Sequence, residues 1–291
     1  MSSLSTPGTG GPEPLLLLLD PAARQTDGES VRIAKDVLCG GADVKVAYPE
    51  SPSELDRMLS HRGRRRPVVI GSDLALQRVL QALHRQRELG ADPVGMVPVG
   101  RAEELATARA LGVPGEPVRA ARAVLSGAPR TFDLLVDDGG GVALGGVRIT
   151  GGARRQVGRT GGWRSLWAKL AAAEQANALT PETADHSPRV RVEADGRLLA
   201  DVHRPVRLVQ LTLQGAGRTD PAGAGVLEVV VSAPGALVRA RAASVSVVGR
   251  GFGYEADGHA VGPVRARTWT VHPGAWGLLL PSARERPLNP G

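Results

Sequence analysis

The stretch Val68–Leu80 reads VVIGSDLALQRVL and combines a short apolar run, a Gly-Ser-Asp turn and the periodicity of an amphipathic helix. A strand that turns through glycine into a helix can bind phosphate, because backbone N–H groups at the helix start point toward the anion. Asp73 is the ionisable side chain of this turn. It could take part in phosphoryl chemistry, or it could simply cap the helix that is predicted to begin at Leu74.

Other residue types that often mark active sites are sparse or badly spaced. The single cysteine, Cys39, allows no internal disulfide and no site with several thiolates. The six histidines lack metal-ligand spacing, so we assign no metal-ligating residues. The glycine-rich segment Gly139–Gly146 lies between two predicted strands and opens no helix, which argues against a dinucleotide-binding loop.

The net charge of +7 raises the question of an anionic partner. Only three of the 36 basic residues are lysines, a bias that is typical of a GC-rich genome and accounts for most of the basicity. The densest basic cluster, HRGRRRP at His61–Pro67, has no aromatic residues among its arginines for base stacking. We therefore expect a solvated loop and not a nucleic-acid site; attraction to anionic lipid headgroups is the alternative.

Strands and helices alternate through the first half of the chain. Apolar runs predict strands at Leu15–Leu19, Asp43–Tyr48, Pro67–Ile70 and Val94–Pro98. Apolar residues at helical spacing predict helices at Glu29–Leu38, Glu54–Ser60 with Ser53 as its cap, Leu74–Arg87, Glu103–Leu111 and Pro117–Leu125. Strands rich in valine, isoleucine and leucine that alternate with helices form a parallel sheet covered on both faces. We predict a three-layer α/β nucleotide-binding domain.

The pattern changes after Phe132 to alternating apolar runs separated by Gly and Asp, interrupted by one helical stretch at about Ser165–Asn177. This pattern predicts a β-rich, antiparallel, sandwich-like domain. We place a leader at residues 1–14, the two domains at 15–130 and 131–285, and a tail at 286–291. The cleft between the domains is the expected ligand site.

The first fourteen residues are rich in Ser, Thr, Gly and Pro and contain no Lys or Arg. They predict a disordered leader and not a secretory signal. The longest apolar run, Leu15–Leu19, is far shorter than the ~20 residues that cross a bilayer. We expect a cytoplasmic protein that can lie peripherally at a membrane.

Five short segments resemble the motifs of the diacylglycerol kinase and sphingosine kinase family, especially its bacterial, actinobacterial-type lipid kinases. They read Asp20-Pro21, Gly71-Ser72-Asp73-Leu74-Ala75, PVGRAEELA at 98–106, AGVLE at 224–228 and Asp257-Gly258-His259. The family carries Asn-Pro, Gly-Gly-Asp-Gly-Thr, Pro-x-Gly-Thr-x-Asn-Asp, Asp-Gly-x-Leu-Asp and Asp-Gly-Glu in the same order and in the same kinds of element. The resemblance extends over about Leu15–Pro281.

The resemblance implies an ATP-dependent lipid kinase that uses Mg²⁺ and transfers a phosphoryl group to a diacylglycerol-like hydroxyl. It implies nucleotide contacts at Asp20, Gly71, Ser72, Gly100, Arg101 and Glu103. It implies catalytic positions at Asp73, Asp257 and His259. Asp257-Gly258 could equally be the two-residue turn of a β-hairpin, and His259 could be a base near neutral pH or an ordinary cleft residue.

Several substitutions weaken the implied chemistry. Ser72 and Leu74 stand where the family has glycines, and a Cβ there would collide with phosphate or disfavour a positive φ. In the second loop Arg101 could hold a phosphate. Glu103 and Glu104, however, place carboxylates at a helix start where an anion would bind. Ala224 removes one of the carboxylates that the family has in its β domain.

We therefore expect a weak or inactive family member, a pseudokinase. An active kinase with a modified site built on Asp73 and Asp257 is one alternative. A non-catalytic lipid- or nucleotide-binding protein or scaffold is another, acting as a homodimer or with a protein partner such as an active paralogue. A salt-sensitive binder of membranes or nucleic acid through Arg62, Arg64, Arg65 and Arg66 is the third.

Overall fold

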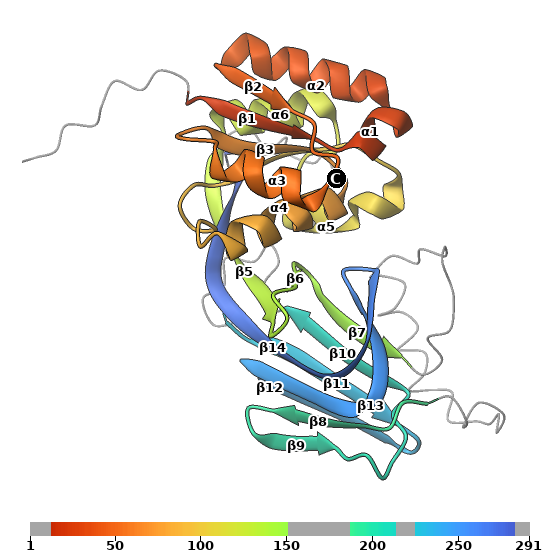
Figure 1. Cartoon of the computed structure of the whole chain (residues 1–291). Coiled ribbons are helices and arrows are strands. Elements are labelled where there is room, and N and C mark those ends of the chain that lie inside the picture. The colour runs from red at the N-terminus through yellow and green to blue at the C-terminus, as the bar shows by residue number, and fades with distance from the viewer. Residues whose placement is uncertain (1–12, 151–186, 214–224, 283–291) are drawn as a thin grey trace, which may run out of the picture.

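The computed structural model describes residues 13–150, 187–213 and 225–282 of the 291. The described elements form two sheets that lie one above the other in Figure 1, with all the described helices around the upper sheet. Residues 1–12 of the predicted leader, the predicted helix Ser165–Asn177, Ala224 and the predicted tail lie outside the described ranges.

Four parallel strands form the first sheet in the order β2-β1-β3-β4. They are β1 (Leu15–Leu19), β2 (Val44–Ala47), β3 (Arg66–Gly71) and β4 (Gly95–Pro98). The β1 side chains alternate between two clusters: Leu16 and Leu18 pack with α3 and α4, whereas Leu15, Leu17 and Leu19 pack with α2 and α6. Helices thus cover both faces of the sheet, which confirms the predicted three-layer α/β domain.

The helices predicted for the first half of the chain are present, with bounds shifted by up to three residues. They are α1 (Pro21–Thr26), α2 (Gly28–Gly41), α3 (Pro52–Ser60), α4 (Asp73–Arg85), the 3₁₀ turn η1 (Ala102–Leu105), α5 (Ala106–Leu111) and α6 (Pro117–Ser126). Ser51 caps α3 in place of the predicted Ser53, because Pro52 takes the first helical position and Ser51 Oγ accepts from Glu54 N at 3.2 Å. The predicted helix 103–111 begins as a 3₁₀ turn, and α1 was not predicted.

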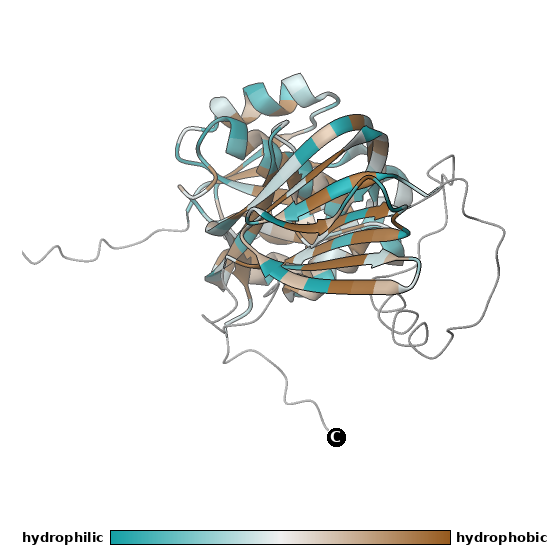
Figure 2. Ribbon diagram, turned by 90° about the horizontal axis from the view of Figure 1, so that it is seen from below, coloured by the Kyte–Doolittle hydropathy of each residue, from teal (hydrophilic) through white to brown (hydrophobic). Residues whose placement is uncertain are grey.

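The second sheet has ten antiparallel strands, which confirms the predicted β-rich domain. Its path runs β12-β11-β10-β7-β13-β14-β5-β6, and β8 and β9 join it through β13. Apolar and polar residues alternate along these strands in Figure 2, as expected where one face of a sheet covers a core. The strands are β5 (Ala128–Asp137), β6 (Val142–Ala143), β7 (Gly146–Thr150), β8 (Val190–Ala194), β9 (Arg197–Ala200), β10 (Leu208–Leu213), β11 (Leu227–Ala233), β12 (Ala236–Ala242), β13 (Ser244–Ala256) and β14 (His259–Leu280).

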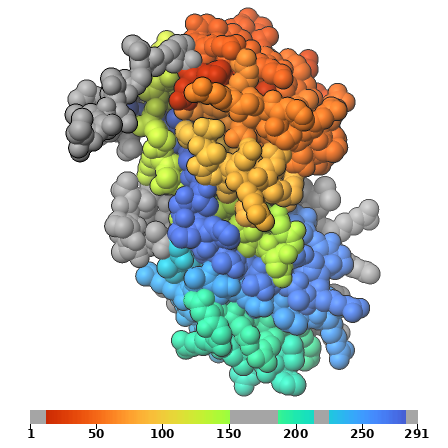
Figure 3. Space-filling model, turned by 60° about the vertical axis from the view of Figure 1, so that its left-hand side comes forward, coloured from red at the N-terminus to blue at the C-terminus, as the bar shows by residue number. Residues whose placement is uncertain are grey.

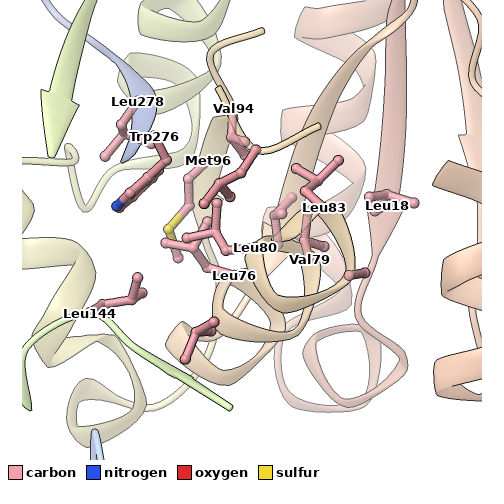
Figure 4. Close-up of a cluster of buried hydrophobic side chains, with 14 of the residues drawn as sticks. Leu18, Leu76, Val79, Leu80, Leu83, Val94, Met96, Leu144, Trp276 and Leu278 are labelled. Carbon is pink, nitrogen blue, oxygen red and sulfur yellow. The ribbon is translucent and has the colours of Figure 1, made fainter. Parts of the chain in front are cut away.

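One hydrophobic cluster joins the two sheets. Leu144, Trp276 and Leu278 from the second sheet and its loops lie near Leu76 and Met96 from the first, as Figure 4 shows. Backbone bonds add to this contact, since Val94 N donates to Gly277 O at 2.8 Å and Leu279 N donates to Val94 O at 3.0 Å. The end of β14 therefore belongs to the core of the upper half, and in Figure 3 its blue surface extends up to the yellow surface of that half.

The basic cluster His61–Pro67 is largely neutralised by acidic neighbours. Arg62, only 6% exposed at its side chain, pairs with Glu88 and Asp92. Arg65 pairs with Asp43 at 2.9 Å, and Arg66 pairs with Glu13. These pairs leave the cluster with little free positive charge, although partners of this surface stay a prediction. Within the described ranges, none of the helices has the length and apolar character that crossing a membrane requires.

Candidate functional site

The loops after β1 and β3 meet at the carboxyl edge of the parallel sheet. Because the chain passes from β1 outward to β2 and then back across to β3, the two loops diverge here, and such a switch point is where open α/β sheets bind ligands. Asp20 N donates to Ile70 O at 3.0 Å. A Cβ on Gly71 would lie 2.5 Å from Asp20 Cβ, so only glycine allows this approach.

The polar side chains of these two loops bond to each other. Asp20 Oδ2 accepts from Ser72 Oγ at 3.1 Å, and Asp20 Oδ1 accepts from Ala22 N at 3.1 Å. The structure thus brings together three of the predicted nucleotide-contacting residues, Asp20, Gly71 and Ser72. In this arrangement the serine hydroxyl and the Ala22 N–H group of α1 donate to a carboxylate of the protein itself.

The loop after β4 lies beside the β3 loop, because Val99 N donates to Gly71 O at 3.0 Å. Gly100 has a φ of +155°, and the Glu104 carboxylate lies 3.0 Å from where its Cβ would be. Glu104 Oε2 also accepts from Arg101 N at 2.9 Å. Glu104 is therefore the side chain that contacts this loop, and it is exposed, as are the predicted contacts Arg101 and Glu103.

Asp73 caps a neighbouring helix and not its own. Its carboxylate accepts from Thr107 N at 2.6 Å and from Ala108 N at 2.9 Å, the first free N–H groups of α5. The predicted cap of its own helix is absent: Ser72 is the N-cap residue of α4, without a side-chain bond to the helix. Burial raises the pKa of Asp73, and the two backbone bonds oppose that shift.

Asp257 occupies a hairpin turn, as its Asp-Gly sequence predicts. Asp257 and Gly258 have φ angles of 49° and 86° between β13 and β14, as a type I′ turn requires. The carboxylate accepts from Leu144 N at 2.6 Å, Gly145 N at 2.8 Å and Gly146 N at 3.1 Å. The pKa of Asp257 is raised to about 6, first by burial and in the same direction by the charge of Asp73, while the three backbone bonds oppose the shift.

A cavity of about 350 Å³ lies between α4 and the second sheet. Its polar lining comes from both domains: Gln77, Arg78, Gln81, Asp137, His259 and Arg267. Its apolar lining also comes from both: Leu74, Leu135, Val142, Ala143, Val147, Val261 and Trp269. The predicted interdomain cleft is therefore present as a cavity, and His259 is the predicted site residue that lines it; the binding of a ligand there stays a prediction.

Asp137 organises the inner wall of this interdomain cavity. It accepts from Tyr254 Oη at 2.9 Å and from Gly139 N and Gly141 N at 2.8 and 2.9 Å, and it pairs with Arg267 at 3.5 Å. Burial, followed by the bond to Asp137, raises the pKa of Tyr254. Sequence reasoning missed this network because its members lie more than a hundred residues apart; the available signal was the strand ending FDLLVDD.

Arg78 and His259 face the interdomain cavity from opposite domains. His259 is partly buried, and its pKa is lowered first by burial and then by the positive charge of Arg78, with a small opposing effect of Asp73. Arg78 is exposed at the second turn of α4 and makes no ion pair with a carboxylate of the described chain. The sequence analysis did not single out Arg78, because its neighbours identify it only as part of an amphipathic helix.

A second cavity of about 300 Å³ lies at the switch point, beside the carboxyl ends of β1 and β2. Asp20, Glu50, Arg78 and Arg85 are its charged lining, together with apolar residues such as Leu55 and Val79. Arg85 is already paired with Asp56 at 2.7 Å. Arg78 and Gln81 of α4 line both cavities, so this helix lies between them.

Neither a protein-family model nor a curated protein sequence matches this chain. Solved structures do match. One from Bacillus anthracis str. Sterne, assigned as a diacylglycerol kinase, is 14% identical with a TM-score of 0.69, and the match covers 94% of this chain and all of that one. This chain has the diacylglycerol kinase fold. Two further structures from the same organism, also assigned as diacylglycerol kinases, match at TM-scores of 0.68 and 0.65 with 15% identity, over 95% and 94% of this chain and 100% and 98% of those chains.

The diacylglycerol kinase fold implies ATP and Mg²⁺, and the loops of this chain do not fit them. The N–H group of Arg101 and those of Thr107 and Ala108 are bonded to carboxylates of the protein. Within the described residues no group of three or more His, Cys, Asp or Glu side chains could hold a metal ion. We therefore derive no phosphoryl-transfer step for this chain.

Proposed function

We propose that this protein is a pseudokinase with the diacylglycerol kinase fold, whose interdomain cavity binds a ligand without phosphoryl transfer. The observation that carries this proposal is the Glu104 carboxylate, which accepts from Arg101 N and lies against Gly100. In a phosphate-binding loop that N–H group would face the anion. Here the protein supplies its own anion.

The charges of the loops support the proposal because they disfavour a polyphosphate. Two unit negative charges 4 Å apart repel by about 1 kcal/mol in water and about 4 kcal/mol near a protein surface, and a nucleotide carries several. Asp73 and Glu104 together would add two such repulsions around the loops. Expelling Glu104 is feasible because the residue is exposed, but Asp73 is buried and fixed by two N–H donors.

The two aspartates that resemble family catalytic residues have structural partners. Asp73 fixes the start of α5, and Asp257 fixes the loop between β6 and β7 through three N–H bonds. Burial raises the pKa of both carboxylates, but oxygens that already accept two or three backbone N–H bonds have few lone pairs left to direct at a substrate hydroxyl. These contacts support a structural role for both residues.

Phosphoryl transfer tests the proposal. The purified protein, Mg-ATP labelled at the γ-phosphate and mixed micelles of diacylglycerol should give no labelled lipid above a no-protein control, while a motif-intact lipid kinase in the same micelles gives product. The same assay is repeated with other divalent metal ions in place of Mg²⁺ and with GTP in place of ATP, to test other metals and another phosphate donor. Labelled lipid that disappears in Asp73→Asn would overturn the pseudokinase proposal.

An active kinase with a modified site is the second candidate, and the cavity at the switch point favours it. That cavity is open beside Asp20 at the place where α/β folds bind nucleotides. The substitution Asp20→Ala distinguishes the two candidates, because Asp20 lines this cavity. An active enzyme would show a raised KM for the donor, whereas the pseudokinase has no transfer to lose.

A further inference from the structure

We infer that the interdomain cavity binds an amphiphile that already carries a phosphate monoester, with Arg78 and His259 contacting the headgroup and the apolar wall receiving the tail. This inference rests on the proposed function, because a protein that bound such a molecule without transfer would act as its carrier or sensor. It concerns the cavity lined by α4, β5, β6, β13 and β14 and not the loops at the switch point.

The two arginines that line the interdomain cavity differ in their partners. Arg267 is paired twice, with Asp137 of the lining at 3.5 Å and with Asp138 outside the lining at 3.0 Å, and Asp137 also accepts from the Tyr254 hydroxyl and two glycine N–H groups. Arg78 has no carboxylate partner in the described chain. A phosphate supplies the missing anion, since the guanidinium donates two parallel bonds to phosphate oxygens.

His259 adds a second donor from the other domain. Its imidazole lines the same cavity and lies within the electrostatic influence of Arg78. In the free protein that cation disfavours a protonated imidazole. A phosphate between the two groups removes this penalty and favours the protonated form, so binding should be accompanied by proton uptake.

The apolar lining fits a tail. Leu74, Val142, Ala143, Val261 and Trp269 come from both domains and surround the polar groups. Leu74 stands where the phosphate-binding loop of the family has glycine, and here its side chain forms part of the cavity wall. The substitution that weakens a nucleotide loop thus adds apolar surface to the neighbouring cavity.

The cavity at the switch point is a poorer place for the anion. Its lining includes the carboxylates of Asp20 and Glu50, which would repel a phosphate there. Arg85, its second cation, is paired with Asp56. Charge complementarity therefore directs the phosphate to the side of Arg78 that faces His259, and it disfavours a nucleotide as the occupant.

Calorimetric titration with short-chain, monomeric lipids tests this inference. Dihexanoyl phosphatidate should bind at least about tenfold more tightly than dihexanoylglycerol or dihexanoyl phosphatidylcholine, and inorganic phosphate alone should bind more weakly than phosphatidate because it buries no tail. Equal binding of the neutral lipid, or phosphate binding as tight as phosphatidate binding, would overturn the amphiphile that we infer.

Two variants locate the headgroup. Arg78→Gln should weaken phosphatidate binding by about tenfold or more, the loss expected for one charge-assisted contact to phosphate. Arg119→Gln, an exposed arginine of α6 that lines neither cavity, is the matched control and should bind like the wild type. In proton NMR the His259 imidazole should show a higher pKa with phosphatidate bound; an unchanged pKa would remove His259 from the site.

Parallel assays keep this inference separate from the proposed function. If phosphatidate does not bind and no lipid is phosphorylated, the inference is wrong and the pseudokinase proposal stands. If diacylglycerol is phosphorylated, the pseudokinase proposal is wrong whatever phosphatidate does. The midpoint temperature of thermal unfolding is the folding control. If Arg78→Gln has the same midpoint as the wild type, a loss of binding is not caused by a loss of folding.

Discussion

Asp73 at the start of α4 and Asp257 in the β13–β14 turn are two buried carboxylates, one from each domain, and the charge of Asp73 raises the pKa of Asp257. Each is held by backbone N–H groups of a neighbouring segment: α5 for Asp73, and the β6–β7 loop for Asp257. Residues that by resemblance belong to catalysis thus fix loops at the domain junction. Consequences for stability follow from this arrangement.

Asp257 should make stability depend on pH in an unusual direction. Its folded pKa of about 6 lies above its ordinary value of 3.8, so the folded state binds the proton more tightly than the unfolded state. Stability from this residue is therefore greatest below pH 4 and falls as pH rises to 6, by up to about 3 kcal/mol. The free energy of unfolding of wild type minus that of Asp257→Asn, measured in urea at pH 4 and pH 7, should be larger at pH 4. A difference independent of pH would contradict the raised pKa.

Asp73→Ala should lower the free energy of unfolding, an effect that can be measured without an activity assay. The substitution leaves Thr107 N and Ala108 N without their acceptor and opens a small cavity, at a cost of about 1–3 kcal/mol. Urea unfolding at pH 7 measures this cost. Asp36→Ala, an exposed residue of α2, is the control and should stay within about 0.5 kcal/mol of wild type. Equal stability of the two variants would show that the Asp73 cap contributes nothing.

Gly71→Ala should be poorly tolerated, because the new Cβ would lie 2.5 Å from Asp20 Cβ. Separating β1 and β3 enough to relieve that contact should cost about 1–3 kcal/mol, as overpacking does elsewhere. Gly28→Ala is the matched control, since nothing lies within 4 Å of its Cβ position at the start of α2. We expect Gly28→Ala to unfold at the wild-type denaturant concentration or above it, and Gly71→Ala clearly below.

Trp276→Ala should weaken both halves of the molecule together. Trp276 is 1% exposed in the cluster shared by the two sheets, and such a deletion costs about 3–5 kcal/mol. Helix content in far-ultraviolet dichroism and tryptophan fluorescence should be lost in a single, earlier transition. Leu198→Ala, 46% exposed on β9, should leave the transition nearly unchanged. Two separate transitions in Trp276→Ala would show that the shared cluster does not couple the halves.

Much of the fold was readable from local pattern. The run Leu15–Leu19 has no polar residue because both faces of β1 are covered, and the Asp257-Gly258 pair forms the turn that its sequence favours. The domain boundary near residue 130 stays a prediction, and β14 shows why sequence alone places it poorly: one strand serves both cores. The cap of α3 is Ser51 and not the predicted Ser53, because Pro52 occupies the first helical position.

The candidate site was readable only in part. The resemblance to family motifs gave Asp20, Gly71 and Gly100, and each of these residues ends or follows a parallel strand, where ligand loops occur. The partner of Asp73 could not be identified, since it lies on a helix more than thirty residues away and is chosen by packing. The same limit hid the Asp137 network and the position of Arg78. Which of two adjacent glutamates fills the β4 loop depended on one turn of 3₁₀ geometry.

Calorimetric titration with Mg-ATP tests the central claim most directly, with Glu104→Gln and its neighbour control Glu103→Gln beside the wild type. We predict no binding heat for wild type and Glu103→Gln, and weak but measurable binding for Glu104→Gln, because that change removes the carboxylate at Arg101 N. Micromolar binding by the wild type would contradict the account, since the loops would then hold a polyphosphate in spite of their own carboxylates.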